Sequence, residues 1–348
     1  MAERRNNPVI KNEFVIIAPE RLNRPYAFQR SPPISLSDGC PFCPGNESKT
    51  LPETLSYRYP GSQSNDPGWW VRFVSNKYPA VSKETELISL EKETNSLFQK
   101  SLITGIHEVG ITRYHGNDFG QPGFDDQYNL TRELLWAIHE RKLSLARENP
   151  KINYAEFFKN RGVDAGGSLD HPHIQLLALE SIPSKIQAEF DTALEYLLNN
   201  EACIYCDIIE AELKSEKRII NQNEHYIVLE PFASKFPYET WIIPKSHERN
   251  YSLTPEKATS LANIVKDTFM RLNVLLNNPD YNFYIKDCSL NNNGRIPIKE
   301  IRELSYHWYI DLSPRLTKAS SWEYSTDVWI NPICPEKAAD DLRKVRVS

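Results

Sequence analysis

His171-Pro-His-Ile-Gln-Leu176, in the first half of the chain, has a counterpart in the second half, His307-Trp-Tyr-Ile-Asp-Leu312. The leading histidines correspond, whereas His173 is answered by Tyr309. On an extended segment, residues 171, 173 and 175 point to one face. The two stretches therefore predict an internal repeat with a shared framework, in which one histidine belongs to the first half alone.

Further elements of the repeat surround these stretches. Each half begins with a Cys-x-x-Cys pair, continues with a strand-like run that ends in a histidine and then has a helical pattern, over 126–148 or 255–277. An aromatic strand follows in each half, over 154–160 or 281–287. We therefore expect an α+β fold of two tandem domains, 1–190 and 191–348, each an antiparallel sheet with packed helices, and we expect the chemistry in the first.

The composition excludes some classes of protein. The chain has 348 residues, 40% of them hydrophobic, with 41 basic and 46 acidic side chains and a formal net charge of -5. Such a chain can bury hydrophobic cores. It lacks the excess of positive charge that proteins use to bind duplex DNA, so a zinc module that binds nucleic acid is disfavoured. No run resembles a signal peptide or a membrane span, which predicts a soluble, cytoplasmic protein without membrane partners.

Two groups of cysteines and histidines have the composition of zinc sites. In a reducing compartment, Cys-x-x-Cys pairs are read first as metal ligands or redox centres. Two thiolates and two imidazoles form the tetrahedral set that zinc prefers. The expected sets are Cys40, Cys43, His115 and His171, and Cys203, Cys206, His247 and His307. With four protein ligands each, both would be structural; packed thiols or a redox pair are the alternatives.

The stretch from 158 to 175 carries the candidate chemistry. A neutral imidazole can attack phosphorus without a separate base, so His173 is the expected nucleophile. Gln175, on the same strand face, would donate to the phosphoryl oxygens on which charge builds. Gly166, Gly167 and Ser168 precede them in a loop that lets a phosphate approach backbone N–H groups. An ordinary histidine and a plain turn are the alternatives for these two features.

These residues resemble the active-site signature of the galactose-1-phosphate uridylyltransferases, a branch of the histidine-triad superfamily built from two related domains. The motifs are His171-Pro-His-x-Gln175, Asn160-x-Gly162, Gly166-x-Ser168, Cys40-Pro-Phe-Cys43-Pro-Gly, Gly105-Ile-His-Glu-Val109 and Trp322-Glu-Tyr-x-Thr326. The resemblance spans nearly the whole chain. It implies two tandem histidine-triad-like domains, a nucleotidyl group carried on His173 and a phosphate held by Gln175.

The resemblance also assigns binding residues and partners. Nucleotide and phosphate binding fall to Arg24, Asn76, Asn160, Gly166, Gly167 and Ser168, and sugar-phosphate binding in a partner subunit's site falls to Glu323 and Asn331. The implied partners are a nucleotide sugar, a sugar 1-phosphate or phosphate, and a second copy of the chain in a homodimer.

Three functions follow as expectations. The first is a ping-pong transfer from UDP-glucose to galactose 1-phosphate through a nucleotidyl-histidine. The second is an ADP-glucose phosphorylase, with phosphate as the acceptor, because the second Cys-Cys-His-His set resembles that related branch more. Ile174 also stands where the uridylyltransferases have a small residue, which predicts a reshaped pocket beside the nucleophile. The third is a zinc-stabilised nucleotide-binding protein without catalysis.

Overall fold

The computed structural model describes residues 2–23, 31, 39–81, 97–98, 101, 103–288, 290 and 304–347. Its strands are β1 (Glu3–Asn6), β2 (Phe14–Ile17), β3 (Glu53–Arg58), β4 (Trp69–Ser75), β5 (Gly105–Thr112), β6 (Tyr154–Arg161), β7 (His173–Leu179), β8 (Ile219–Gln222), β9 (Tyr226–Leu229), β10 (Thr240–Pro244), β11 (Tyr281–Lys286), β12 (Tyr309–Pro314) and β13 (Ile330–Asn331). Its α-helices are α1 (Leu130–Glu148), α2 (Ser184–Asn200), α3 (Ile204–Ser215), α4 (Pro255–Leu276), α6 (Ser321–Thr326) and α7 (Pro335–Lys344).

The main sheet runs continuously through both halves of the repeat. Its order is β3-β4-β5-β7-β6-β11-β12-β10-β9-β8, and all neighbouring strands in it are antiparallel. The order β4-β5-β7-β6 in the first half is mirrored by β9-β10-β12-β11 in the second. The halves meet at β6 and β11, where Tyr284 pairs with Phe158. The α+β class with antiparallel sheet and packed helices, predicted from the repeat, is confirmed.

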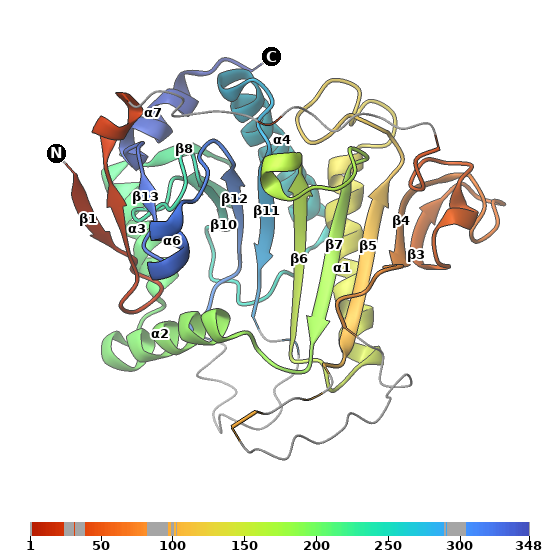
Figure 1. Ribbon diagram of the computed structural model, residues 1–348, viewed down its shortest axis with the longest axis horizontal. Helices are drawn as coiled ribbons and strands as arrows, with labels where there is room; N and C mark the ends of the chain where they lie inside the picture. The colour runs from red at the N-terminus through yellow and green to blue at the C-terminus, as the bar shows by residue number, and fades with distance from the viewer. Residues whose placement is uncertain are drawn as a thin grey trace.

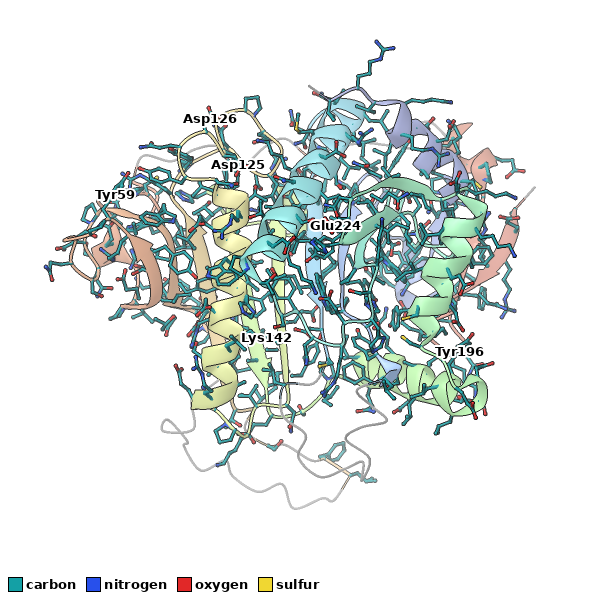
Figure 2. All side chains as sticks on the ribbon, turned by 180° about the vertical axis from the view of Figure 1, so that it is seen from behind. Tyr59, Asp125, Asp126, Lys142, Tyr196 and Glu224 are labelled. Carbon is teal, nitrogen blue, oxygen red and sulfur yellow. The ribbon has the colours of Figure 1, made fainter. Side chains whose placement is uncertain are left out.

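One face of this sheet is covered by α1 and α4, which lie side by side in Figure 2. Both helices show the predicted spacing, and their inward residues, such as Leu134, Ile138, Leu261 and Val265, are fully buried. Thr254 starts α4 by accepting the Lys257 N–H, and Pro255 occupies its first turn, where no N–H is needed. The helices thus bury their apolar stripes against the sheet.

The strands place their side chains alternately on two faces of the sheet, one packed against the helices and one that carries the candidate functional residues. Ile174, Leu176, Phe283 and Ile310 point toward α1 and α4 and belong to one apolar core that spans both halves. Their neighbours in sequence, His173 and Gln175 in β7 and Tyr309 and Asp311 in β12, therefore point to the other face. Figure 1 views the sheet from that face, with β5, β6 and β7 in front of α1.

The expected boundary between residues 190 and 191 falls inside α2. A shared core and a continuous sheet join the two halves, so the division into two domains stays a prediction about ancestry and folding units. Among the described residues, no helix is both long and apolar enough to cross a membrane.

Candidate functional site

His173 is the first residue of β7 and is held in one orientation by the backbone. The side chain is 7% exposed, and its Nδ1 lies 2.8 Å from the carbonyl oxygen of His171. Because a carbonyl can only accept, the proton must lie on Nδ1, which leaves the lone pair on Nε2. Burial lowers the pKa of His173, so the ring is neutral at pH 7. This is the form that can attack phosphorus.

Gln175 is oriented by a histidine that sequence reasoning did not single out. Nδ1 of His107, in β5, accepts the backbone N–H of Ala80 at 3.1 Å. The proton of the neutral ring is therefore on Nε2, which donates to Oε1 of Gln175 at 3.0 Å. With its oxygen occupied, Gln175 presents its NH₂ group as the donor. Nδ2 of Asn76 lies 3.1 Å from the same Nε2, which brings a third predicted residue to this point, although two N–H groups that face each other in this tautomer do not form a hydrogen bond.

The cysteine hook is packed against the candidate nucleophile through Phe42. The ring centroid of Phe42 lies 5.3 Å from that of His173 and 6.0 Å from that of His171. Phe42 stands between the two cysteines of the hook, so the hook positions both the metal ligands and the wall beside His173. Its place inside Cys-Pro-Phe-Cys was the only sequence signal for this role.

The first predicted metal set is assembled by the structure. Cys43 Sγ lies 3.1 Å from His115 Nδ1 and 3.6 Å from His171 Nδ1, Cys40 Sγ lies 3.7 Å from His171 Nδ1, and the two Nδ1 atoms are 3.3 Å apart. A tetrahedral zinc separates its ligand atoms by about 3.4–3.8 Å. The two contacts of His171 with the cysteines fall in this range and those of His115 are slightly shorter, so the donor set is close to the size that this ion needs.

The surroundings of the first set also suit a cation. His171 Nε2 donates to the Thr112 carbonyl at 2.7 Å, which leaves Nδ1 as the ligand atom. Burial lowers the pKa of His171 to about 4, so this ligand is neutral. Burial and then the neighbouring Cys40 raise the pKa of Cys43 to about 11, so a positive ion is needed to hold its thiolate at neutral pH.

The second predicted set is only partly assembled. Cys203, Cys206 and His247 form a cluster, with Cys206 Sγ 3.4 Å from His247 Nδ1. His307 is outside it: its Nδ1 and Nε2 face the carbonyls of Trp308 and Ser246, each at 3.0 Å. Its ring lies near that of His247, with centroids 5.5 Å apart. The structure therefore brings together three of the four expected ligands.

The glycine loop after β6 is shaped by side chains of the second half. Gly162 has φ +83°, and a Cβ there would lie 1.9 Å from Oδ1 of Asp280. Asp280 accepts the N–H of Asp164 at 2.9 Å, and Asn282 donates to the carbonyl of Ala165 at 2.9 Å. Only glycine can bring the loop this close to Asp280.

Asn160 ties this loop to the nucleophile. It lies in β6 two residues beyond Phe158, which pairs with Gln175, so it stands beside the end of β7 that carries His173. Its Oδ1 accepts from Asn282 at 2.7 Å. In the loop that follows, Gly167 N–H donates to the Gly162 carbonyl at 2.8 Å, while Gly166 and Ser168 are exposed.

The remaining predicted binding residues lie elsewhere. Glu323 is taken up at the start of α6, where it accepts the Ser320 N–H at 2.9 Å. Asn331 is 1% exposed and donates to the backbone carbonyls of Ser234 and Phe236. Neither side chain has a recorded contact with β7 among the described residues, and Arg24 lies outside those residues. Their sugar-phosphate and nucleotide roles stay predictions.

Ile174 does not reshape the pocket, contrary to the expectation. Its side chain is fully buried in the core, on the face of β7 opposite His173. Gly110, across from it in β5, provides the room, because a Cβ there would lie 2.8 Å from Ile174 Cγ2. The alternation of the strand decides this outcome.

Comparisons with known proteins agree with this fold. Residues 69–346 match the family model described as a domain of unknown function, DUF4921. The chain is 31% identical to the ADP-glucose phosphorylase of Arabidopsis thaliana over 355 residues, which cover 99% of this chain and 93% of that protein. It is 26% identical to the galactose-1-phosphate uridylyltransferase of Thermotoga maritima over 355 residues, which cover 100% of this chain and 99% of that protein.

A solved structure extends the likeness to the whole fold. The crystal structure of the Arabidopsis thaliana ADP-glucose phosphorylase with bound ADP-glucose superposes with a TM-score of 0.80 at 30% identity, covering 100% of both chains. Fold, site and relatives together define a nucleotidyl-transferring enzyme with a histidine-triad-like fold. Within that class, the chain belongs to the family that contains the galactose-1-phosphate uridylyltransferases and the ADP-glucose phosphorylases.

Proposed function

We propose that this enzyme transfers a nucleotidyl group from a nucleotide sugar to a phosphate-bearing acceptor, with His173 as the covalent carrier. The observation that carries the proposal is the hydrogen bond from His173 Nδ1 to the His171 carbonyl, which fixes a neutral ring with a free Nε2. A histidine that served only packing would have no need of that tautomer beside an amide donor and a glycine loop.

The proposed reaction has two displacements. Nε2 of His173 attacks the α-phosphorus, the bond from phosphorus to the oxygen of the sugar phosphate breaks, and the sugar 1-phosphate leaves with that oxygen. An oxygen of the acceptor then attacks the same phosphorus and breaks its bond to Nε2. The NH₂ group of Gln175, aimed by His107, donates to the phosphoryl oxygens as their charge grows. The N–H groups of Gly166 and Gly167 already donate to the carbonyls of Val163 and Gly162, so in this proposal the exposed Ser168 hydroxyl would be the loop's donor to the phosphates.

Adenylyl transfer from ADP-glucose to inorganic phosphate is the first substrate pair that we propose. Full-length identity to the ADP-glucose phosphorylase is 31%, against 26% for the uridylyltransferase. The second half also contains the cluster Cys203, Cys206 and His247. A second site with cysteine ligands resembles the ADP-glucose phosphorylase branch more, so this cluster supports the same substrate pair. The products would be glucose 1-phosphate and ADP.

Uridylyl transfer from UDP-glucose to galactose 1-phosphate is the second candidate. The resemblance of His171-Pro-His-x-Gln175 to the uridylyltransferase signature supports it, and so does the similarity to the Thermotoga maritima uridylyltransferase, which covers 100% of this chain. Its products would be glucose 1-phosphate and UDP-galactose. The same covalent step serves both pairs, so only the base and the acceptor distinguish them.

The test is the formation of a labelled nucleotidyl-enzyme. The enzyme is mixed with ADP-glucose or UDP-glucose carrying a labelled α-phosphate, quenched, and assayed for label on protein; phosphate or galactose 1-phosphate is then added to discharge it. His173→Asn keeps a donor for the His171 carbonyl but lacks the nucleophile, so it should take up no label. His225→Asn, at a distant histidine, is the matched control. Full turnover by folded His173→Asn would refute the proposal.

We also infer two structural properties. Zinc would be held by Cys40, Cys43, His115 and His171, and when bound it would fix the cysteine hook on which Phe42 and His173 depend. A homodimer is implied by the resemblance to the family, and light scattering after size-exclusion chromatography would test it.

A further inference from the structure

A cavity of about 510 Å³ lies in the second half of the molecule, away from His173. Its floor is the face of β10, β11 and β12 that points away from α4, and its walls come from α2, α3 and the segment around Pro8. Figure 1 shows the sheet from this side, with α2 and β1 next to the second half. The enclosure is built from side chains of at least five elements.

The register of the sheet makes this cavity the counterpart of the proposed active site. Tyr309 and Asp311 hold the positions in β12 that His173 and Gln175 hold in β7, and both line the cavity. Asp311 pairs with Trp241 of β10, and Tyr309 pairs with Lys286 of β11. The two corresponding positions of the repeat therefore carry different side chains, and those of the second half line this cavity.

The replacements remove phosphoryl chemistry. Tyr309 donates its hydroxyl to Glu189 at 2.9 Å, and burial raises its pKa well above the ordinary value, so it is no nucleophile. Asp311 presents a carboxylate where Gln175 presents an NH₂ group, and a carboxylate repels phosphate. Glu239 is a second lining acid on the neighbouring strand, and it accepts the Phe236 N–H at 3.2 Å.

The cations of the cavity are already engaged. Lys235 pairs with Glu13 at 2.7 Å, and Lys286 pairs with Glu156 at 3.1 Å. Arg315 donates to Tyr284 and Asn282 and stacks over the ring of Phe236, and Arg218 pairs with glutamates on two sides. Lys185, a fifth lining cation, lies 3.6 Å from Glu13 and 3.9 Å from Asp327. Among the described residues, Arg315 is the one cation of the cavity without a carboxylate partner, and its two hydrogen bonds hold it against Phe236.

One polar group of the cavity is left without a partner. Trp241 is 6% exposed, and its indole N–H has no acceptor among the described residues. A buried N–H in this state is costly unless a ligand or water accepts from it. Its ring lies 4.5 Å from that of Tyr309. Phe236 and Trp329, with centroids 4.7 Å apart, line another part of the cavity.

We infer that this cavity binds a neutral sugar ring. Aromatic faces pack against the apolar C–H faces of a pyranose, the Trp241 N–H donates to a hydroxyl oxygen, and Asp311 accepts from hydroxyl groups. A phosphate on the ligand would meet the carboxylate of Asp311, whereas burial raises the pKa of Glu239 to about 8 and leaves that group mostly uncharged at pH 7. The site is non-catalytic and separate from the nucleotidyl-transfer site.

The experiment uses D-glucose and D-galactose as probes, with glucose 1-phosphate as the charged counterpart, and follows their binding to the full chain by saturation-transfer NMR. We expect a dissociation constant of about 1–10 mM for at least one neutral sugar. Trp241→Phe should raise it about fivefold, the usual effect of one neutral hydrogen bond. Nucleotidyl transfer by this variant should stay that of the wild type.

Two further variants keep the inference testable. Ala211→Trp, at an exposed position on the cavity rim in α3, should block the cavity without disturbing the core and abolish the sugar signal. Asp311→Asn should let glucose 1-phosphate compete with glucose. His173→Asn should leave sugar binding unchanged, which separates this site from the proposed function.

Three results would overturn the inference. One is the absence of any neutral-sugar signal in the wild type. Another is a signal that Trp241→Phe and Ala211→Trp leave unchanged. The third is a wild-type preference for glucose 1-phosphate that depends on Trp241.

Discussion

His107→Phe tests how the proposed phosphoryl donor is aimed. Phenylalanine keeps the volume of the imidazole but removes the Nε2–H that donates to Gln175 Oε1 at 3.0 Å. One neutral hydrogen bond contributes about 0.5–1.5 kcal/mol, so formation of the nucleotidyl-enzyme should slow about two- to twelvefold. Gln175→Ala removes the donor itself and should cost about 10²–10³ in the same step. Quenched-flow measurement of labelled enzyme in a single turnover reports both.

The double variant makes this prediction sharp. If His107 acts only through Gln175, then His107→Phe should have no further effect in the Gln175→Ala background. His107→Gln, which keeps an N–H in roughly the same place, should recover part of the lost rate. Equal slowing by His107→Phe in both backgrounds would show that the hydrogen bond from His107 does not orient the Gln175 amide, and it would refute this role of His107.

Three other perturbations follow from the structure. Cys43→Ala should remove one zinc per chain and lower the unfolding midpoint, as measured by elemental analysis and calorimetry, because metal binding adds to folding free energy. Gly162→Ala should destabilise the chain by more than about 1–3 kcal/mol in chemical unfolding, because its φ is +83° and its methyl group would meet Asp280; Gly166→Ala, also at positive φ but with nothing within 4 Å, should cost less. Burial raises the pKa of Glu239 from 4.5 to about 8, so its folded state favours the proton and stability should fall as pH rises from about 5 to 8. Glu239→Gln should flatten that part of the stability profile and leave the protein more stable at pH 8.

The sequence predicted those parts of the molecule that the repeat expresses twice. Paired cysteines, helical spacing and aromatic strands gave the antiparallel sheet, α1 and α4, and the first metal cluster. The sheet also places His173 and Gln175 on one face, as strand alternation required. These features depend on local periodicity or on ligand chemistry, both of which can be read without coordinates.

What could not be predicted depends on contacts between distant segments. His107 reaches Gln175 only because β5 and β7 are neighbours in the sheet, and the motif Gly105-Ile-His-Glu-Val109 that contains it gives no sign of this contact. Ile174 was expected to reshape the pocket; strand alternation alone already places it on the face opposite His173, and the distant Gly110 provides the room for it there. His307 has the spacing of a ligand, yet its two nitrogens face backbone carbonyls.

The second half contributes to the first even though its own histidine has become Tyr309. Asp280 directly precedes β11 and Asn282 lies in it, and both hold the loop that begins at Gly162. Because β6 pairs with β11 at the centre of one sheet, this support is built into the seam between the halves. The second half has no histidine at the position of His173, but its strand β11 keeps the backbone of the glycine loop in place. Because β11 supports this loop through Asp280 and Asn282, Asp311 and Trp241 in the neighbouring strands are free to line a cavity for which we propose a different ligand.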